Sequence, residues 1–215
     1  MQQNLWQEHL INAMKRIIVA IVLFVGTAVF WGAAGQAPKM ALRIGVGGAS
    51  GLRNAGVFPE SESVLSLKGI YGPRYEDPDY TPVGNFGVDY KLGRRVEFSL
   101  DFSWGMCSVS ALDGVTRELL GVCDAQSIGI VPGLRFLWQD REDRVNALYS
   151  RIGLGADAML VSDIESTGFD LHMAYEVVPI GIRLQFAEKV PLFAYGELVF
   201  GSCVNGARLG FGYAF

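Results

Sequence analysis

The stretch RVEFSLDFSW, residues 95–104, alternates between apolar and polar side chains without a break. Its apolar positions are Val96, Phe98, Leu100, Phe102 and Trp104, and its polar positions are Glu97, Ser99, Asp101 and Ser103. Successive side chains of a β-strand point to opposite faces, so this pattern predicts a strand with one apolar and one polar face.

The same period recurs along the chain after residue 38. Eight segments show it: 40–48, 85–91, 95–104, 127–138, 147–158, 177–186, 191–200 and 207–215. In the segment 177–186 the predicted apolar face begins at Val178. The strand lengths suit a tilted strand that crosses a bilayer, which needs about 9–11 residues. The pattern predicts an all-β protein of eight strands, or of ten if the first loop holds another hairpin.

The segments between these strands differ in length. Short charged links are expected at 92–94, 139–144 and 187–190, and longer loops are expected after the other strands, the first over residues 49–83. Short turns at one end and long loops at the other are typical of a closed antiparallel transmembrane β-barrel.

The face opposite the apolar one carries a balanced set of charges. Its arginines are Arg43, Arg135, Arg151, Arg183 and Arg208, and its carboxylates are Asp89, Glu97, Asp101, Asp157 and Glu197. Arginine suits buried bidentate ion pairs. We therefore predict a neutralised charge network that fills the barrel lumen. In a soluble β-sandwich, the alternative fold, the same face would meet water and the balance would be incidental.

The C-terminal stretch ARLGFGYAF, residues 207–215, continues the alternation to the last residue. In lipid every backbone polar group must find a partner within the protein, so a sheet can span only by closing on itself. We expect the last strand to pair with the first, and its aromatic side chains to face the membrane.

The stretch MKRIIVAIVLFVGTAVFWGAAGQA, residues 14–37, has a basic start, an apolar run and small residues, as a secretory signal peptide requires. We expect a signal peptide over residues 14–35 and a mature barrel over 38–215. Residues 1–13 do not fit a signal peptide and are interpreted as lying upstream of the true start. The alternative is an anchor that is not cleaved.

The remaining composition restricts the function. A formal net charge of −4 gives no reason to expect a nucleic-acid partner. Cys107 and Cys123 flank one predicted loop and could form a disulfide, with two buried free thiols as the alternative; Cys203 is left over. No spacing of Cys or His suggests a metal site, and no cofactor is expected.

With these features the sequence resembles the small bacterial outer-membrane β-barrels of the porin-like, OmpA/OmpX-type class. The terminal GFGYAF, with Phe211, Tyr213 and Phe215, looks like the signal that the barrel-assembly machinery reads, and IGIVPGLRFLW (128–138) and YEVVPIGIRLQF (175–186) resemble strands of that family. The resemblance implies the bacterial outer membrane as location, and membrane lipid and lipopolysaccharide as surroundings.

The expected function is a structural or surface-interaction role without catalysis, and the loop 49–83 is the candidate contact for a surface ligand. One alternative is a lipid-modifying enzyme that uses His172, which follows Asp170 by two residues, with Ser162 and Ser166 in the preceding loop. Another is a narrow solute channel that opens when the lumen ion pairs rearrange. Tyr-rich loops can bind partners. For the Tyr-rich residues 67–82 of the first loop, the alternative is ordinary loop sequence without a partner.

Overall fold

The computed structural model of the protein describes residues 39–50, 74–138, 146–162, 167–187 and 190–215. The expected signal peptide lies outside these ranges. The described strands are β1 (Met40–Ser50), β2 (Arg74–Tyr80), β3 (Val83–Lys91), β4 (Val96–Leu112), β5 (Leu119–Leu137), β6 (Ala147–Ser162), β7 (Thr167–Ala187), β8 (Val190–Gly201) and β9 (Val204–Ala214). No described helix is long and apolar enough to cross a membrane.

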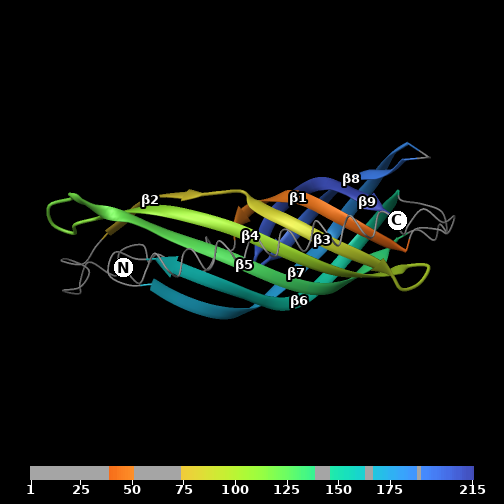
Figure 1. Ribbon diagram of the computed structural model, residues 1–215, viewed down its shortest axis with the longest axis horizontal. Coiled ribbons are helices and arrows are strands. Elements are labelled where there is room, and N and C mark those ends of the chain that lie inside the picture. Colours follow the sequence, from red (N-terminus) through yellow and green to blue (C-terminus); the bar gives the residue numbers. More distant parts are fainter. Residues whose placement is uncertain (1–38, 51–73, 139–145, 163–166, 188–189) are drawn as a thin grey trace. The chain divides into compact units, whose positions relative to one another are not determined.

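Eight of the described strands close into a ring (Figure 1). The order is β4-β3-β1-β9-β8-β7-β6-β5, and β5 returns to β4 through an antiparallel pairing that runs from Val96↔Phe136 to Leu112↔Leu119. The last strand pairs with the first, with Phe211 opposite Ile44. The predicted closed barrel and the pairing of first and last strands are therefore confirmed, and the sandwich alternative is wrong.

Strand β2 was not predicted. It lies within the segment 49–83 that was expected to be a loop, and it pairs with the outer part of β4, from Arg74↔Leu112 to Tyr80↔Cys107. Thr81, which lies between β2 and β3, remains bound to β4, because its backbone N–H donates to the carbonyl of Met106 at 3.0 Å. Pro82, which has no N–H to donate to a ladder, follows at the break between the two strands.

The predicted strand lengths were too short at one end of the barrel. β4 has 17 residues, β5 has 19, β6 has 16 and β7 has 21. The residues assigned to the long loops between these strands are mostly strand, and the described link between β4 and β5 is only 113–118. These stretches are rich in Ser, Cys, Ala and Val, whose alternation is weak in hydropathy, so the sequence pattern did not show them as strands.

The opposite end of the barrel follows the prediction, with the link 92–95 between β3 and β4 and the link 188–189 between β7 and β8. We call it the turn end, and the other end the loop end. Beyond the loop end of β8, a part of the sheet continues as a partial wall (Figure 1). This sheet extension comprises β2, Cys107–Leu112 of β4, Leu119–Ala125 of β5, Gly155–Ser162 of β6 and Thr167–Ala174 of β7.

The alternation of β7 changes phase at Pro179. Val178 is fully buried and Val177 is exposed, whereas on the other side of the proline Ile180 is exposed and Gly181 is buried. The register with both neighbouring strands shifts at this point, as at a β-bulge. The prediction that Val178 lies on the apolar outer face is therefore wrong, because the bulge reverses the alternation on its N-terminal side.

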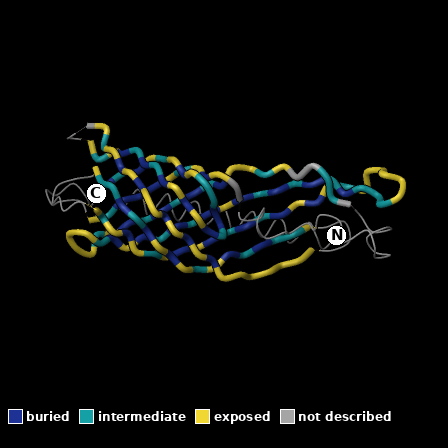
Figure 2. The backbone as a smooth tube through the Cα atoms, turned by 180° about the vertical axis from the view of Figure 1, so that it is seen from behind, coloured by how far each residue is buried: buried dark blue, intermediate teal, exposed yellow. Residues whose placement is uncertain are grey.

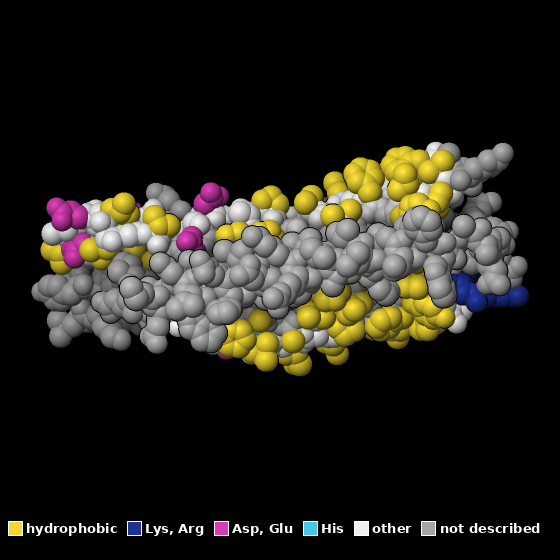
Figure 3. Space-filling model, in the orientation of Figure 1, with side chains coloured by type: hydrophobic (Ala, Val, Ile, Leu, Met, Phe, Trp, Pro, Cys, Tyr) yellow, Lys and Arg dark blue, Asp and Glu magenta, His cyan; other side chains and the backbone are white. Residues whose placement is uncertain are grey.

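The two faces of the barrel wall differ in chemistry. Large hydrophobic side chains are exposed on the outer face, and charged side chains are buried on the inner one, so burial alternates along each strand (Figure 2). In the space-filling view hydrophobic side chains gather over the visible strands, and acidic side chains appear at the loop end (Figure 3). Outer examples are Ile44, Leu154 and Phe211, which are 67%, 68% and 59% exposed. In water such a surface would be costly, whereas in lipid it is favourable.

Candidate functional site: the charged barrel interior

The ten charged residues that the sequence placed in the lumen are all buried: Arg43, Asp89, Glu97, Asp101, Arg135, Arg151, Asp157, Arg183, Glu197 and Arg208. They come from all eight strands of the ring, and adjacent pairs such as Glu97↔Arg135 and Glu197↔Arg208 stand opposite each other in the strand register. The structure joins nine of them into one ion-pair network with Glu176; Asp157 stands apart.

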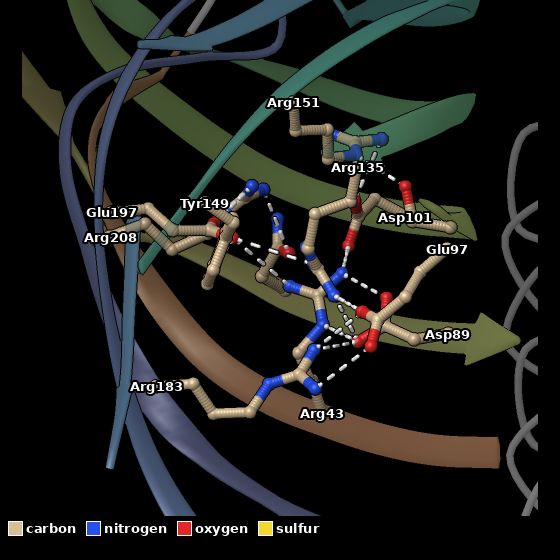
Figure 4. Close-up of polar contacts among 12 residues, drawn as sticks. Arg43, Asp89, Glu97, Asp101, Arg135, Tyr149, Arg151, Arg183, Glu197 and Arg208 are labelled. Atoms are coloured by element: carbon tan, nitrogen blue, oxygen red, sulfur yellow. Dashed lines mark hydrogen bonds and ion pairs between the residues drawn. The ribbon is translucent and has the colours of Figure 1, made fainter. Parts of the chain in front are cut away.

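Three arginines converge on Asp89 (Figure 4). Its Oδ2 atom lies 2.8 Å from Nε of Arg43, 2.5 Å from Nη1 of Arg135 and 3.2 Å from Nη2 of Arg183. Glu97 shares two of these partners, at 3.1 Å from Arg135 and 2.9 Å from Arg183. Because each guanidinium has several donors, one arginine can neutralise two carboxylates at once.

A second centre forms around Glu197. Its Oε2 atom lies 2.5 Å from Nη2 of Arg208, and its Oε1 atom accepts a hydrogen bond of 2.7 Å from the hydroxyl of Tyr149. The guanidinium of Arg135 lies over the ring of Tyr149, 4.4 Å from its centroid (Figure 4). Aromatic rings therefore fill the space between the ion pairs and interact favourably with the cations.

Glu176 belongs to this network but was not predicted. It accepts from Arg208 at 2.7 Å and also pairs with Arg151, which reaches Asp101 at 2.8 Å. Glu176 lies before Pro179 in β7, so the phase change described above turns it inward. A proline inside an otherwise regular strand pattern is the signal that would have indicated the bulge. With Glu176, five arginines face five carboxylates, so the network is formally neutral.

Asp157 lies outside this network. It is 1% exposed, and neither of its carboxylate oxygens has a hydrogen-bond partner among the described residues. In the strand register it stands opposite His172. His172 instead places Nε2 3.1 Å from Oδ2 of Asp170, and both of these side chains are largely exposed.

The arrangement around His172 does not resemble a hydrolytic triad. Ser162 pairs with Thr167 and lies on the outer face of the sheet, because it is five positions from Asp157, which faces inward. Ser166 lies outside the described residues. His172 stands opposite Asp157 and so lies on the inner face. The described part of the chain also has no group of three or more His, Cys, Asp or Glu residues that could hold a metal ion.

The three cysteines are buried free thiols. Cys107 stands opposite Ala125 and Cys123 stands opposite Val109, so the two cysteines are diagonal neighbours on β4 and β5. Diagonal positions on neighbouring strands lie about 7–8 Å apart, which exceeds disulfide geometry. The disulfide suggested by the sequence is therefore not formed in this structure.

The C-terminal aromatics lie where the sequence placed them, on the outer wall of β9. Phe211 is exposed, and its ring stacks on Phe186 of β7 at a centroid distance of 6.0 Å. Tyr213 and Phe215 share this alternation and are partly exposed.

Together these features define the class of the protein. A closed antiparallel β-barrel with an apolar outer wall, a charged inner wall and short turns at one end is a transmembrane barrel of the bacterial outer-membrane type. The fold class expected from the sequence is thereby confirmed.

No family model and no curated protein matches the chain. Solved structures do match it. The N-terminal β-barrel domain of Pseudomonas aeruginosa OprF is 15% identical, with a TM-score of 0.45, and the match covers 84% of this chain and 100% of that one. Ail, the attachment invasion locus protein of Yersinia pestis in complex with the heparin analogue sucrose octasulfate, is 13% identical, with a TM-score of 0.46 and the same coverage.

Proposed function

We propose that this protein is a barrel of the outer membrane that neither conducts nor catalyses, and that it presents the sheet extension as an interaction surface. The observation that carries the first part is the neutral network inside the wall. Arg43, Arg135, Arg151 and Arg208 are among the largest fully buried side chains of the described residues. An eight-stranded barrel has an interior just wide enough for side chains, so these groups occupy the space that a pore would need.

The sheet extension supports the second part of the proposal. Beyond Tyr175, whose carbonyl accepts from the N–H of Ser202, the described residues of β7 pair only with β6. The stretch Thr167–Ala174 is thus a sheet edge on the loop end, and an edge offers unpaired backbone groups to an added strand. Within the segment 49–83, the proposed contact for a surface ligand includes β2, which forms the other edge of the sheet extension. Residues 51–73 of that segment lie outside the described residues.

Planar-bilayer recordings test the closed lumen. We expect no stable conductance steps from the wild-type chain, because the ion pairs that fill the lumen would have to separate. The double variant Arg151→Ala, Arg208→Ala removes two fully buried side chains from the network and should show steps if the barrel still folds. Large and stable steps from the wild type would favour the narrow channel instead.

Hydrogen exchange tests the interaction surface. Amides that point away from β6 in Thr167–Ala174 should exchange fast in the isolated barrel, whereas amides in the paired part of β7 should be protected. When intact cells are exposed to a partner that adds a strand to this edge, hydrogen exchange of the fast-exchanging amides should become slower. Protection of all these amides in the isolated barrel would show that the edge is already covered.

The alternative of a lipid-modifying enzyme is tested at His172. Replacement of His172 by Ala should leave the mass spectrum of lipid A unchanged in cells that produce the variant. A changed lipid A profile would favour the enzyme and contradict the proposal.

We further propose that the barrel-assembly machinery recognises Phe211, Tyr213 and Phe215. Replacement of Phe215 by Ala should lower the amount of barrel in the outer membrane while leaving the unfolding midpoint of the assembled fraction almost unchanged. Replacement of the similarly outward Leu192 by Ala is the matched control, since it removes a large apolar side chain elsewhere on the wall.

A further inference from the structure

The apolar outer face of β7 continues past the level at which the outer face of β4 becomes polar. Phe169, Leu171 and Met173 are 67%, 62% and 82% exposed, as much as the side chains of the lipid-facing wall. We call these three residues the β7 apolar strip. Alternate positions Asp170 and His172 carry the polar side chains of the opposite face.

The outer face of β4 becomes polar nearer to the turn end. Trp104 and Met106 are its last large apolar side chains before Ser108 and Ser110. The hydroxyl of Ser108 on β4 donates a hydrogen bond of 2.6 Å to Oδ1 of Asp124 on β5. This polar pair interrupts the apolar band between β4 and β5, although Val122 of β5 is exposed beyond it.

The strand register shows that the strip lies farther out than this boundary. Trp104 is opposite Ile128, Ile128 is opposite Ala158, and Ala158 is opposite Leu171, so these residues form one row.

Such rows climb from β4 to β7, because the strands of a barrel tilt against its axis. The row that begins at Val96, the first residue of β4, passes Phe136 and Ser150 and meets β7 between Val178 and Gly181, well inside the end of β7 at Ala187. Leu171 therefore stands farther from the turn end than Trp104 does.

The strip is continuous with the lipid-facing wall. On the same face of β7 the exposed side chains of Tyr175, Val177, Ile180 and Ile182 follow it toward the turn end. The exposed run along this strand is visible at the loop end of the barrel (Figure 2). Because the strip continues the lipid-facing wall, lipid is the occupant that we expect to cover it.

The backbone limits how deep the strip can lie. The carbonyl of Tyr175 accepts from the N–H of Ser202 at 3.0 Å, and beyond it the described part of β7 has backbone pairs only with β6. Unpaired backbone groups are not tolerated in hydrocarbon. An apolar face with a hydrated edge suits the boundary between headgroups and acyl chains.

We propose that the β7 apolar strip rests in this boundary region of the outer leaflet, so that the barrel contacts lipid over a taller surface at β7 than at β4. The inference depends on the membrane placement proposed above. It assigns the outer face of the β6–β7 hairpin to lipid, and it leaves the backbone edge and the inner face with His172 for other contacts.

Site-directed spin labelling tests this assignment. A nitroxide at position 171 is compared with labels at positions 182 and 110, in a chain that carries alanine at Cys107, Cys123 and Cys203, reconstituted in phosphatidylethanolamine–phosphatidylglycerol vesicles. Ile182 is the lipid-facing control on the same strand, and Ser110 is the control on the outer face of β4. We expect the ratio of oxygen to nickel-chelate collisions at 171 to exceed that at 110 several-fold.

Two results would overturn the inference: a ratio at 171 equal to that at 110, or few collisions with either probe, which would show that protein covers the strip. A water-accessible label at 182 would instead refute the membrane placement itself. If the alanine background does not fold, tryptophan at position 171, 182 or 110 in the chain with its own cysteines replaces the labels. Extra quenching by brominated lipid at 171, relative to 110, is then expected, and its absence overturns the inference.

Discussion

Glu197 and Arg208 stand directly opposite each other on β8 and β9, and Nη2 of Arg208 lies 2.5 Å from Oε2 of Glu197. Both side chains are buried inside the barrel wall. Glu197 also lies 3.6 Å from Nη1 of Arg43 and 3.6 Å from Nη2 of Arg135, so its charge is shared by three arginines.

The variant Glu197→Gln should be strongly destabilised. It leaves Arg208 with Glu176 alone and removes one negative charge from a neutral network, and the loss of one partner of a buried ion pair costs roughly 3–5 kcal/mol. Urea unfolding of the barrel in detergent, followed by tryptophan fluorescence, measures the loss. The double variant Glu197→Gln, Arg208→Gln should recover part of it. Equal stability of Glu197→Gln and the wild type would contradict the network.

The variant Gly87→Ala should also lower the stability. A Cβ atom at Gly87 would lie 2.5 Å from Oδ1 of Asp101 and 2.8 Å from Nη2 of Arg43, so it would push apart an ion pair of the lumen. Overpacking of this kind costs roughly 1–3 kcal/mol. Gly84→Ala on the same strand is the control, because its nearest neighbours would lie at 3.7 Å or more. The same unfolding assay should show little change for Gly84→Ala.

The variant Asp157→Asn should be more stable than the wild type. A buried carboxylate without a donor disfavours the folded state, and a neutral amide of the same shape lowers that cost by about 1–3 kcal/mol. Asp101→Asn is the opposite case, because the Asp101 carboxylate lies 2.8 Å from both Arg43 and Arg151. We expect the urea midpoint to rise for Asp157→Asn and to fall for Asp101→Asn. A fall for both would show that Asp157 has a partner.

The tip of the β4–β5 hairpin should respond to acid through Asp113. The backbone N–H groups of Thr116 and Val115 donate to its Oδ1 atom at 2.7 Å and 2.8 Å, and these bonds hold the pKa of the carboxyl below its usual value. The stability that the ionised Asp113 carboxylate contributes is therefore fully present above the pKa of an unfolded aspartate, about 4. It is lost as the pH falls through the lower pKa of the folded protein. Amide chemical shifts of Val115 and Thr116 should follow this titration, and Asp113→Asn should abolish it.

The sequence predicted the barrel because its strongest signal is the one that the membrane imposes. Where a strand crosses lipid, large apolar side chains such as Phe98 and Phe102 alternate with charged ones such as Glu97 and Asp101, and both the strand and its inward face could be identified. The buried positions of the ten charged residues follow from the same alternation.

The same reasoning did not find the sheet extension, because the selective pressure of lipid is absent there. Val109 and Ala111 are buried beside Ser108 and Ser110, and the contrast in hydropathy between these neighbours is small. Glu176 was missed for a different reason, since one bulge at Pro179 reverses the inward and outward positions of all residues before it in β7. A change of register depends on backbone pairing with two neighbouring strands, and the periodicity of a single segment does not contain it.

The central claim is that the apolar wall of a closed barrel faces lipid while the charges neutralise one another inside. Gel migration of the chain extracted from outer membranes, with and without boiling in dodecyl sulfate, tests it most directly. A closed barrel whose backbone groups are all paired around the ring should resist the detergent, so the unboiled chain should migrate as a compact form and shift on boiling. Identical migration of the boiled and unboiled chain would contradict the account.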